Sequence, residues 1–85
     1  MYRVVLRPPA QKFFRKLRDK SLAARLVEAM RSLAADPRPP GYDKLAGPEE
    51  FCRVRVGDYR IIYQVQDDAL LVLVVKIGHR REVYR

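Results

Sequence analysis

The sequence predicts a small α+β domain in which an N-terminal strand and a helical hairpin precede a three-stranded antiparallel meander. Two patterns carry this prediction. Apolar residues recur at helical spacing through residues 10–34, whereas apolar and polar residues alternate through residues 50–66. A further apolar run at residues 69–77 follows an Asp-Asp turn. We therefore expect a small mixed sheet with the helices packed on one face.

A short strand is expected at residues 2–7. Pro8-Pro9 ends this strand and suits the first turn of a helix, where proline is tolerated. The helix that follows has an apolar stripe at positions i, i+3, i+4 and i+7. The stripe consists of Ala10, Phe13, Phe14 and Leu17.

A second helix can be capped by Asp19 or Ser21. It ends at Asp36-Pro37, because the residue before a proline avoids the helical conformation. Its apolar stripe consists of Leu22, Leu26, Met30 and Leu33. Only a few residues separate the two helices, so we expect an antiparallel helical hairpin.

The loop at residues 37–48 holds four of the six prolines, and the meander follows it. Gly57-Asp58 and Asp67-Asp68 provide its two turns. The strands are expected at residues 50–56, 59–66 and 69–77. The last strand is apolar on both faces, which predicts a central strand covered on both sides.

Basic and apolar side chains alternate on the strand before the first turn. Arg53 and Arg55 therefore share one face, and Cys52 with its apolar neighbours occupies the other. A two-residue turn places Arg55 opposite Arg60 on the next strand. Because like charges across a sheet repel, this patch is best explained if an anion binds there.

Composition limits the classes of function. The chain has 85 residues, and we expect one domain spanning 1–85, too small for a deep cofactor chamber, so no cofactor is expected. Its net charge of +8 favours a polyanionic partner over a charge that serves solubility alone. Cys52 is the single cysteine, so neither a disulfide nor a multi-cysteine metal site is expected. The apolar runs are too short for a membrane span or a secretory leader, so we expect a cytoplasmic protein with no membrane partner.

Three segments resemble the RelE/ParE toxin superfamily over essentially the whole chain. These are KLAG at 44–47, RVRVGDYRIIYQV at 53–65 and IGHRREVY at 77–84. The resemblance is closer to the RelE branch, whose members are toxins of type II toxin–antitoxin systems and cleave mRNA on the ribosome without a metal. It implies three partners: mRNA in the ribosomal decoding site, a cognate antitoxin, and operator DNA only as the toxin–antitoxin complex.

The resemblance also implies a set of site residues. Arg55 and Arg60 would hold the scissile phosphate, and Arg80 would lie beside the leaving oxygen. Tyr84 would stack on a base, as aromatic side chains do with unstacked RNA. The proposed RNA-binding residues are Arg53, Arg55 and Lys44.

This sequence departs from the family pattern in three places. Arginines replace the lysines often found on the strand before the turn, and His79 stands where a lysine can occur. The C-terminal helix of some members is also not expected here. Because arginine is a poor proton acceptor, His79 becomes the candidate general base.

Other interpretations remain open. Arg53 and Arg55 could be edge-strand charges that prevent aggregation, Arg60 could form a structural pair with Asp58 or Glu82, and Tyr84 could pack the end of the chain. The whole protein could instead be a ParE-like toxin that poisons DNA gyrase, or a basic module that binds nucleic acid without cleaving it.

Overall fold

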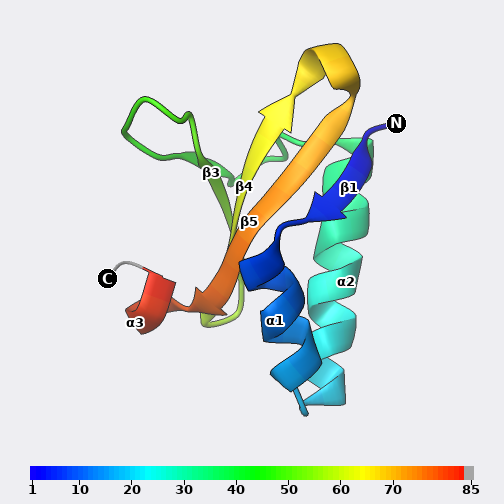
Figure 1. Cartoon of the computed structure of the whole chain (residues 1–85), viewed down its shortest axis with the longest axis vertical. Coiled ribbons are helices and arrows are strands. Elements are labelled where there is room, and N and C mark those ends of the chain that lie inside the picture. The colour runs from blue at the N-terminus through cyan, green and yellow to red at the C-terminus, as the bar shows by residue number, and fades with distance from the viewer. Residues whose placement is uncertain (84–85) are drawn as a thin grey trace.

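A computed structural model describes residues 1–83 as two helices packed on one side of a five-stranded sheet (Figure 1). The helices are α1 (Pro8–Lys16), α2 (Lys20–Ala35) and a final turn α3 (Arg80–Val83). The strands are β1 (Arg3–Leu6), β2 (Asp43–Lys44), β3 (Cys52–Val56), β4 (Tyr59–Gln66) and β5 (Leu71–His79). A 3-10 turn, η1 (Asp67–Ala69), joins β4 to β5.

The sheet has the strand order β1-β5-β4-β3-β2. Its first strand runs parallel to β5, and all other neighbours are antiparallel, so the sheet is mixed. The helical hairpin between β1 and the meander provides the crossover that a parallel pair requires. The predicted α+β class and its arrangement of elements are confirmed.

Local sequence explains where the helices begin and end. Prolines occupy the first two positions of α1, where a missing N–H costs no hydrogen bond. Asp19 caps α2 by accepting a hydrogen bond from the Leu22 N–H at 3.0 Å. Leu17 and Asp36, which follow the two helices, have extended backbones. The sequence prediction of both helices is therefore confirmed to within a residue or two.

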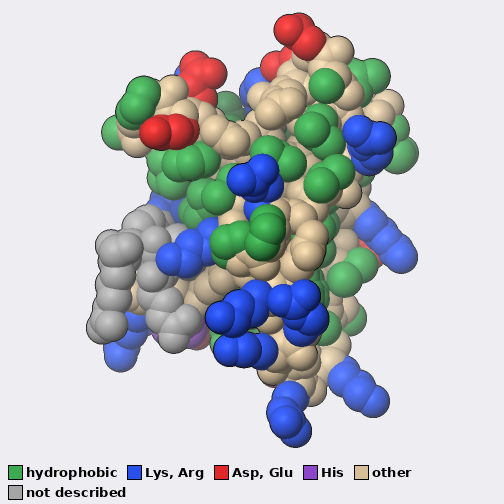
Figure 2. All heavy atoms as spheres, in the orientation of Figure 1, with side chains coloured by type: hydrophobic (Ala, Val, Ile, Leu, Met, Phe, Trp, Pro, Cys, Tyr) green, Lys and Arg blue, Asp and Glu red, His purple; other side chains and the backbone are tan. Residues whose placement is uncertain are grey.

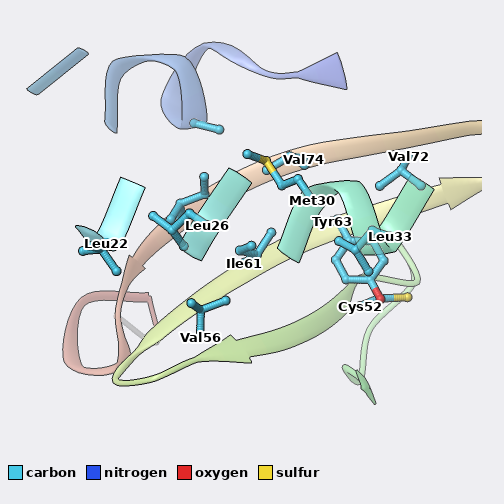
Figure 3. Close-up of a cluster of buried hydrophobic side chains, with 12 residues drawn as sticks. Leu22, Leu26, Met30, Leu33, Cys52, Val56, Ile61, Tyr63, Val72 and Val74 are labelled. Carbon is cyan, nitrogen blue, oxygen red and sulfur yellow. The ribbon is translucent and has the colours of Figure 1, made fainter. Parts of the chain in front are cut away.

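The core lies between α2 and the three long strands (Figure 3). Leu26 and Leu33 of α2 pack with Ile61 and Tyr63 of β4, and all four side chains are almost fully buried. The Tyr63 hydroxyl donates a hydrogen bond of 2.6 Å to the Pro37 carbonyl, which joins the proline-rich loop to the sheet. Burial raises the pKa of this hydroxyl well above its ordinary value. The face of the sheet that carries Tyr63 is thus the core-facing one; we call the opposite side the open face.

The structure differs from prediction on β5. Tyr63 pairs with Val74 but Ile62 pairs with Lys76, so Val75 is an extra residue in the ladder, a β-bulge. The strand is central, as predicted, yet Leu71 and Leu73 on the open face are only half-buried, so the expected cover on both sides is not seen within residues 1–83. The predicted Asp-Asp turn is a 3-10 turn that ends with Leu70 at a φ of 50°.

None of the helices in residues 1–83 combines the length and the apolar character that crossing a lipid bilayer would demand.

Candidate functional site

The turn between β3 and β4 aligns two arginines. Gly57 has a φ of 60° and Asp58 does not have a positive φ, which fits a tight hairpin turn with glycine in its first central position. This turn pairs Val56 with Tyr59 and Arg55 with Arg60. Because Tyr59 packs against the core, Arg55 and Arg60 both lie on the open face. The sequence-based placement of this pair is confirmed.

Arg60 is only partly exposed. Its Nη1 donates to the carbonyls of Gly57 (3.3 Å) and Tyr59 (3.2 Å), whereas its Nε is buried and has no acceptor among the described residues. On the β5 side it faces Gly78, which has no side chain. Burial lowers the pKa of Arg60, and the charges of Arg55, Arg53 and Arg80 lower it further. Arg60 thus carries a desolvated positive charge surrounded by like charges.

Arg80 is brought to the same region by backbone contact. Its N–H donates a 2.9 Å hydrogen bond to the Asp58 carbonyl, which fixes the start of α3 against the β3–β4 turn. Its exposed charge lowers the pKa of Arg60. We call Arg53, Arg55, Arg60 and Arg80 the arginine cluster.

Arg53 is held differently from its neighbours. Asp43 on β2 pairs with it, and one carboxylate oxygen accepts hydrogen bonds from Arg53 Nε at 3.1 Å and Nη2 at 2.5 Å. Only 15% of the Arg53 side chain is exposed. Sequence reasoning missed Asp43, because a carboxylate in a proline-rich loop gives no sign that a two-residue strand will place it beside an arginine.

Arg55, by contrast, is exposed and makes no ion pair with any side chain that the structure describes. The alternative in which Arg60 pairs with Asp58 is not seen, since their side chains form no ion pair. β2 covers β3 only at Cys52 and Arg53, so Arg55 lies on an uncovered part of this strand and its alternative as an edge-strand charge is not excluded. Neither arginine forms an ion pair with a described carboxylate, so Arg55 and Arg60 are the candidate seat for an anion such as a phosphate, which two guanidinium groups can grip through several hydrogen bonds.

The structure does not bring His79 or Lys44 to this seat. His79 pairs with Tyr59, and their rings are 5.5 Å apart in an edge-to-face contact on the core-facing side of the sheet. The His79 Nδ1 accepts a hydrogen bond of 3.3 Å from the Arg81 N–H. Lys44 pairs with the buried Cys52, so it also lies on the core-facing side, where it forms an ion pair with Glu50 at 3.7 Å.

Tyr84 and Cys52 are the remaining residues for which the sequence suggested a role. Tyr84 lies outside the described residues, so its predicted stacking role stays a prediction. Burial raises the pKa of the Cys52 thiol, which favours its predicted role as a small core residue over that of a nucleophile. Within the described part of the chain, no three His, Cys, Asp or Glu side chains gather as a metal site would need.

Comparisons with known proteins agree with this fold. Residues 4–84 match the family model for the ParE toxin of type II toxin–antitoxin systems, parDE. The chain is 31% identical to a RelE-like toxin protein of Escherichia coli, over 93% of this chain and 83% of the relative. It is 30% identical to the toxin RelG of Mycobacterium tuberculosis, over 99% and 97%.

Solved structures show the same similarity. The toxin in the intact E. coli RelBE toxin–antitoxin complex matches 93% of this chain and 96% of its own, with a TM-score of 0.79 and 26% identity. The isolated E. coli RelE toxin matches 99% and 92%, with a TM-score of 0.79 and 28% identity. The archaeal RelE–RelB complex of Pyrococcus horikoshii matches 95% and 97%, with a TM-score of 0.80 and 28% identity.

Proposed function

Because the chain belongs to the RelE/ParE family of toxins from type II toxin–antitoxin systems, we propose that it is a ribosome-dependent endoribonuclease that cleaves mRNA. The observation that carries this proposal is the pairing of exposed Arg55 with desolvated Arg60 on the open face. A single-stranded RNA phosphate is the anion that best suits so crowded a pair.

The chemistry requires no metal. The ribose 2′-oxygen attacks the adjacent phosphorus while the bond to the 5′-oxygen breaks, which leaves a 2′,3′-cyclic phosphate and a 5′-hydroxyl. The phosphorane that forms in between carries extra negative charge, and fixed guanidinium groups stabilise it because they need no reorientation. In this scheme Arg55 and Arg60 hold the scissile phosphate, and Arg80 lies on the side of the leaving oxygen.

The basic charge of the helical hairpin supports the proposal that the protein binds a structured RNA such as that of the ribosome. Residues 7–35 contain eight Lys and Arg against two Asp and Glu. Figure 2 shows part of this excess as basic side chains that gather over α1. This second basic surface on the helical hairpin would allow the ribosome to hold the toxin while the open face receives the message.

An antitoxin completes the proposed system. The open face combines arginines with half-buried apolar residues of β5, such as Leu71 and Leu73. A segment with acidic and apolar side chains fits such a surface and would compete with RNA for it. The relatives from E. coli and P. horikoshii were solved as RelE–RelB toxin–antitoxin complexes.

The description of the matching family model favours a second candidate, a ParE-like toxin that acts on DNA gyrase. One experiment separates the two. A defined message is translated in a reconstituted system with this protein, and new 5′-ends are mapped. Cuts in phase with codons, present only with ribosomes, support the nuclease. An uncut message together with trapped gyrase–DNA complexes in a parallel supercoiling assay supports the second candidate.

A further inference from the structure

A groove of about 320 Å³ lies between α1 and β5, at the side of the sheet. β1 ends at Leu6, which pairs with Val74, so β5 beyond Val74 has no neighbouring strand on that side among the described residues. Helix α1 lies beside this part of β5 instead (Figure 1). Consecutive residues of a strand point to opposite faces, yet Lys76 and Ile77 both line the groove, so the groove lies at this free edge of β5.

Most of the groove is lined by apolar side chains, namely Pro9, Phe13, Leu17 and Ile77. Phe13 and Leu17 are only half-buried, although both belong to the apolar stripe of the first helix. The Phe13 ring is held in place by edge-to-face contacts with Phe14 and Tyr59, with 6.0 Å between the ring centroids in each case. Because contact with an apolar ligand would remove this surface from water, the groove favours a ligand with apolar groups.

Three lysines, Lys12, Lys16 and Lys76, complete the lining of the groove. All three are exposed, and none forms an ion pair with a side chain that the structure describes. Lys12 and Lys16 lie about one turn apart on α1 and therefore on the same side of the helix. The groove thus combines an apolar lining with three uncompensated positive charges, to which carboxylates are complementary.

Two other occupants fit this combination less well. Structured RNA can contact the lysines as part of the basic surface of the helical hairpin, but its phosphates would leave the apolar lining exposed to water. A second copy of the chain would bring two sets of three lysines together, and lysine on an edge strand is a common means of preventing such pairing. A protein segment that carries both carboxylates and apolar side chains satisfies the lysines and the apolar lining together.

We propose that the groove between α1 and β5 binds a segment of a partner protein in which acidic and apolar side chains alternate. The apolar side chains contact Phe13 and Leu17, the carboxylates pair with the lysines, and an extended backbone adds to the free edge of β5. This inference goes beyond the proposed function, because none of the residues of the arginine cluster lines the groove.

The test uses a short fluorescein-labelled peptide of alternating Glu and Leu, titrated with the native protein at physiological ionic strength and followed by fluorescence anisotropy. We expect the double variant Lys12→Glu/Lys76→Glu to weaken binding about tenfold or more, because each reversed charge turns an attraction into a repulsion. Lys20→Glu/Arg31→Glu is the control with the same change in net charge, at exposed residues of α2 outside the groove. It should bind the peptide nearly as the native protein does, since salt screens distant charges.

A second peptide, with Lys in place of Glu, guards against a folding defect. It should bind Lys12→Glu/Lys76→Glu and not the native protein. An equal loss in the control variant would mean that only net charge attracts the peptide, and would overturn the proposal. So would peptide-induced changes in backbone amide chemical shifts that are confined to residues 53–64, because the peptide would then lie on the arginine cluster. If the native protein does not bind the acidic peptide, and Lys12→Glu/Lys76→Glu instead weakens the binding of a short single-stranded RNA, the groove is an RNA site and the proposal is wrong.

Discussion

Arg55 and Arg60 lie directly opposite each other across β3 and β4, with the tight turn at Gly57 immediately beyond them. Two like charges in this position destabilise the hairpin unless an anion lies between them. The folded protein nevertheless holds both charges in this position. The effect of an anion on its stability can therefore be measured without knowledge of the substrate.

An anion should therefore stabilise the folded protein. Inorganic phosphate at about ten times its dissociation constant adds about 1.4 kcal/mol to the free energy of unfolding, as for any ligand that binds only the native state. We expect Arg60→Gln to abolish this specific part of the gain, as measured by thermal unfolding at constant ionic strength. Arg31→Gln, on the exposed side of α2, is the matched control and should respond to phosphate like the native protein. Equal gains in both variants would mean that the seat binds no phosphate.

The lowered pKa of Asp67 makes the stability of the folded protein depend on pH. Hydrogen bonds from Arg38 (2.9 and 3.2 Å) and from the Tyr2 hydroxyl (2.6 Å) lower the pKa of this carboxyl to about 2. The folded pKa is below the unfolded one, so this contribution is complete above about pH 4 and is lost as the pH falls through about 2.

The urea midpoint of Asp67→Asn should therefore be lower than that of the native protein at pH 6, and the difference should shrink as the pH approaches 2. The neighbouring Asp68→Asn serves as control, because Asp68 makes no hydrogen bond with a described residue through its side chain. A difference that stays constant across this range would show that Asp67 does not titrate as described.

A substitution at Tyr63 tests how the proline-rich loop is attached to the sheet. Replacing Tyr63 by Phe keeps the buried ring but leaves the Pro37 carbonyl without its donor. An unsatisfied buried acceptor costs about 1–3 kcal/mol, and we expect the free energy of unfolding to fall by that amount. Tyr59→Phe is the control, since no hydrogen bond from the Tyr59 hydroxyl to a described residue is present. Equal effects of the two changes would remove the Pro37 contact from the account.

The bulge at Val75 is a feature of β5 that the sequence analysis did not predict. The alternation in β3 and β4 is regular, so the placement of Arg55 opposite Arg60 followed from the turn alone. In β5 the extra residue reverses the face of every side chain after it, so Ile77 and His79 point toward the core side and Lys76 does not. The sequence does contain a sign of this bulge, because strict alternation from Val72 and Val74 would place the charged Lys76 in the core.

Asp43 illustrates a different limit. Helix stripes, caps and turns are local patterns, and the sequence predicted them closely. The contact between Asp43 and Arg53 depends on a two-residue strand that pairs across a loop containing Gly47, which has a φ of 129°. Propensity does not predict such a short pairing, because the sheet that already exists stabilises it.

The position of His79 leads to a prediction about the proton acceptor. Its ring packs on Tyr59 and not among the arginines, so His79→Gln should leave the pH–rate profile of cleavage unchanged. The measurement is single-turnover cleavage of ribosome-bound mRNA between pH 5 and pH 9. A pH–rate profile that changes in this variant would instead identify His79 as the general base expected from sequence.

The most direct test of the arginine seat is the single-turnover rate of mRNA cleavage on the ribosome by the Arg60→Ala variant, compared with Arg31→Ala. Removing one donor that stabilises the charge of a transition state costs about 100-fold or more. We expect a loss of this size for Arg60→Ala, with ribosome binding and thermal unfolding close to native, and no loss for Arg31→Ala. A native cleavage rate in the Arg60→Ala variant would contradict the account.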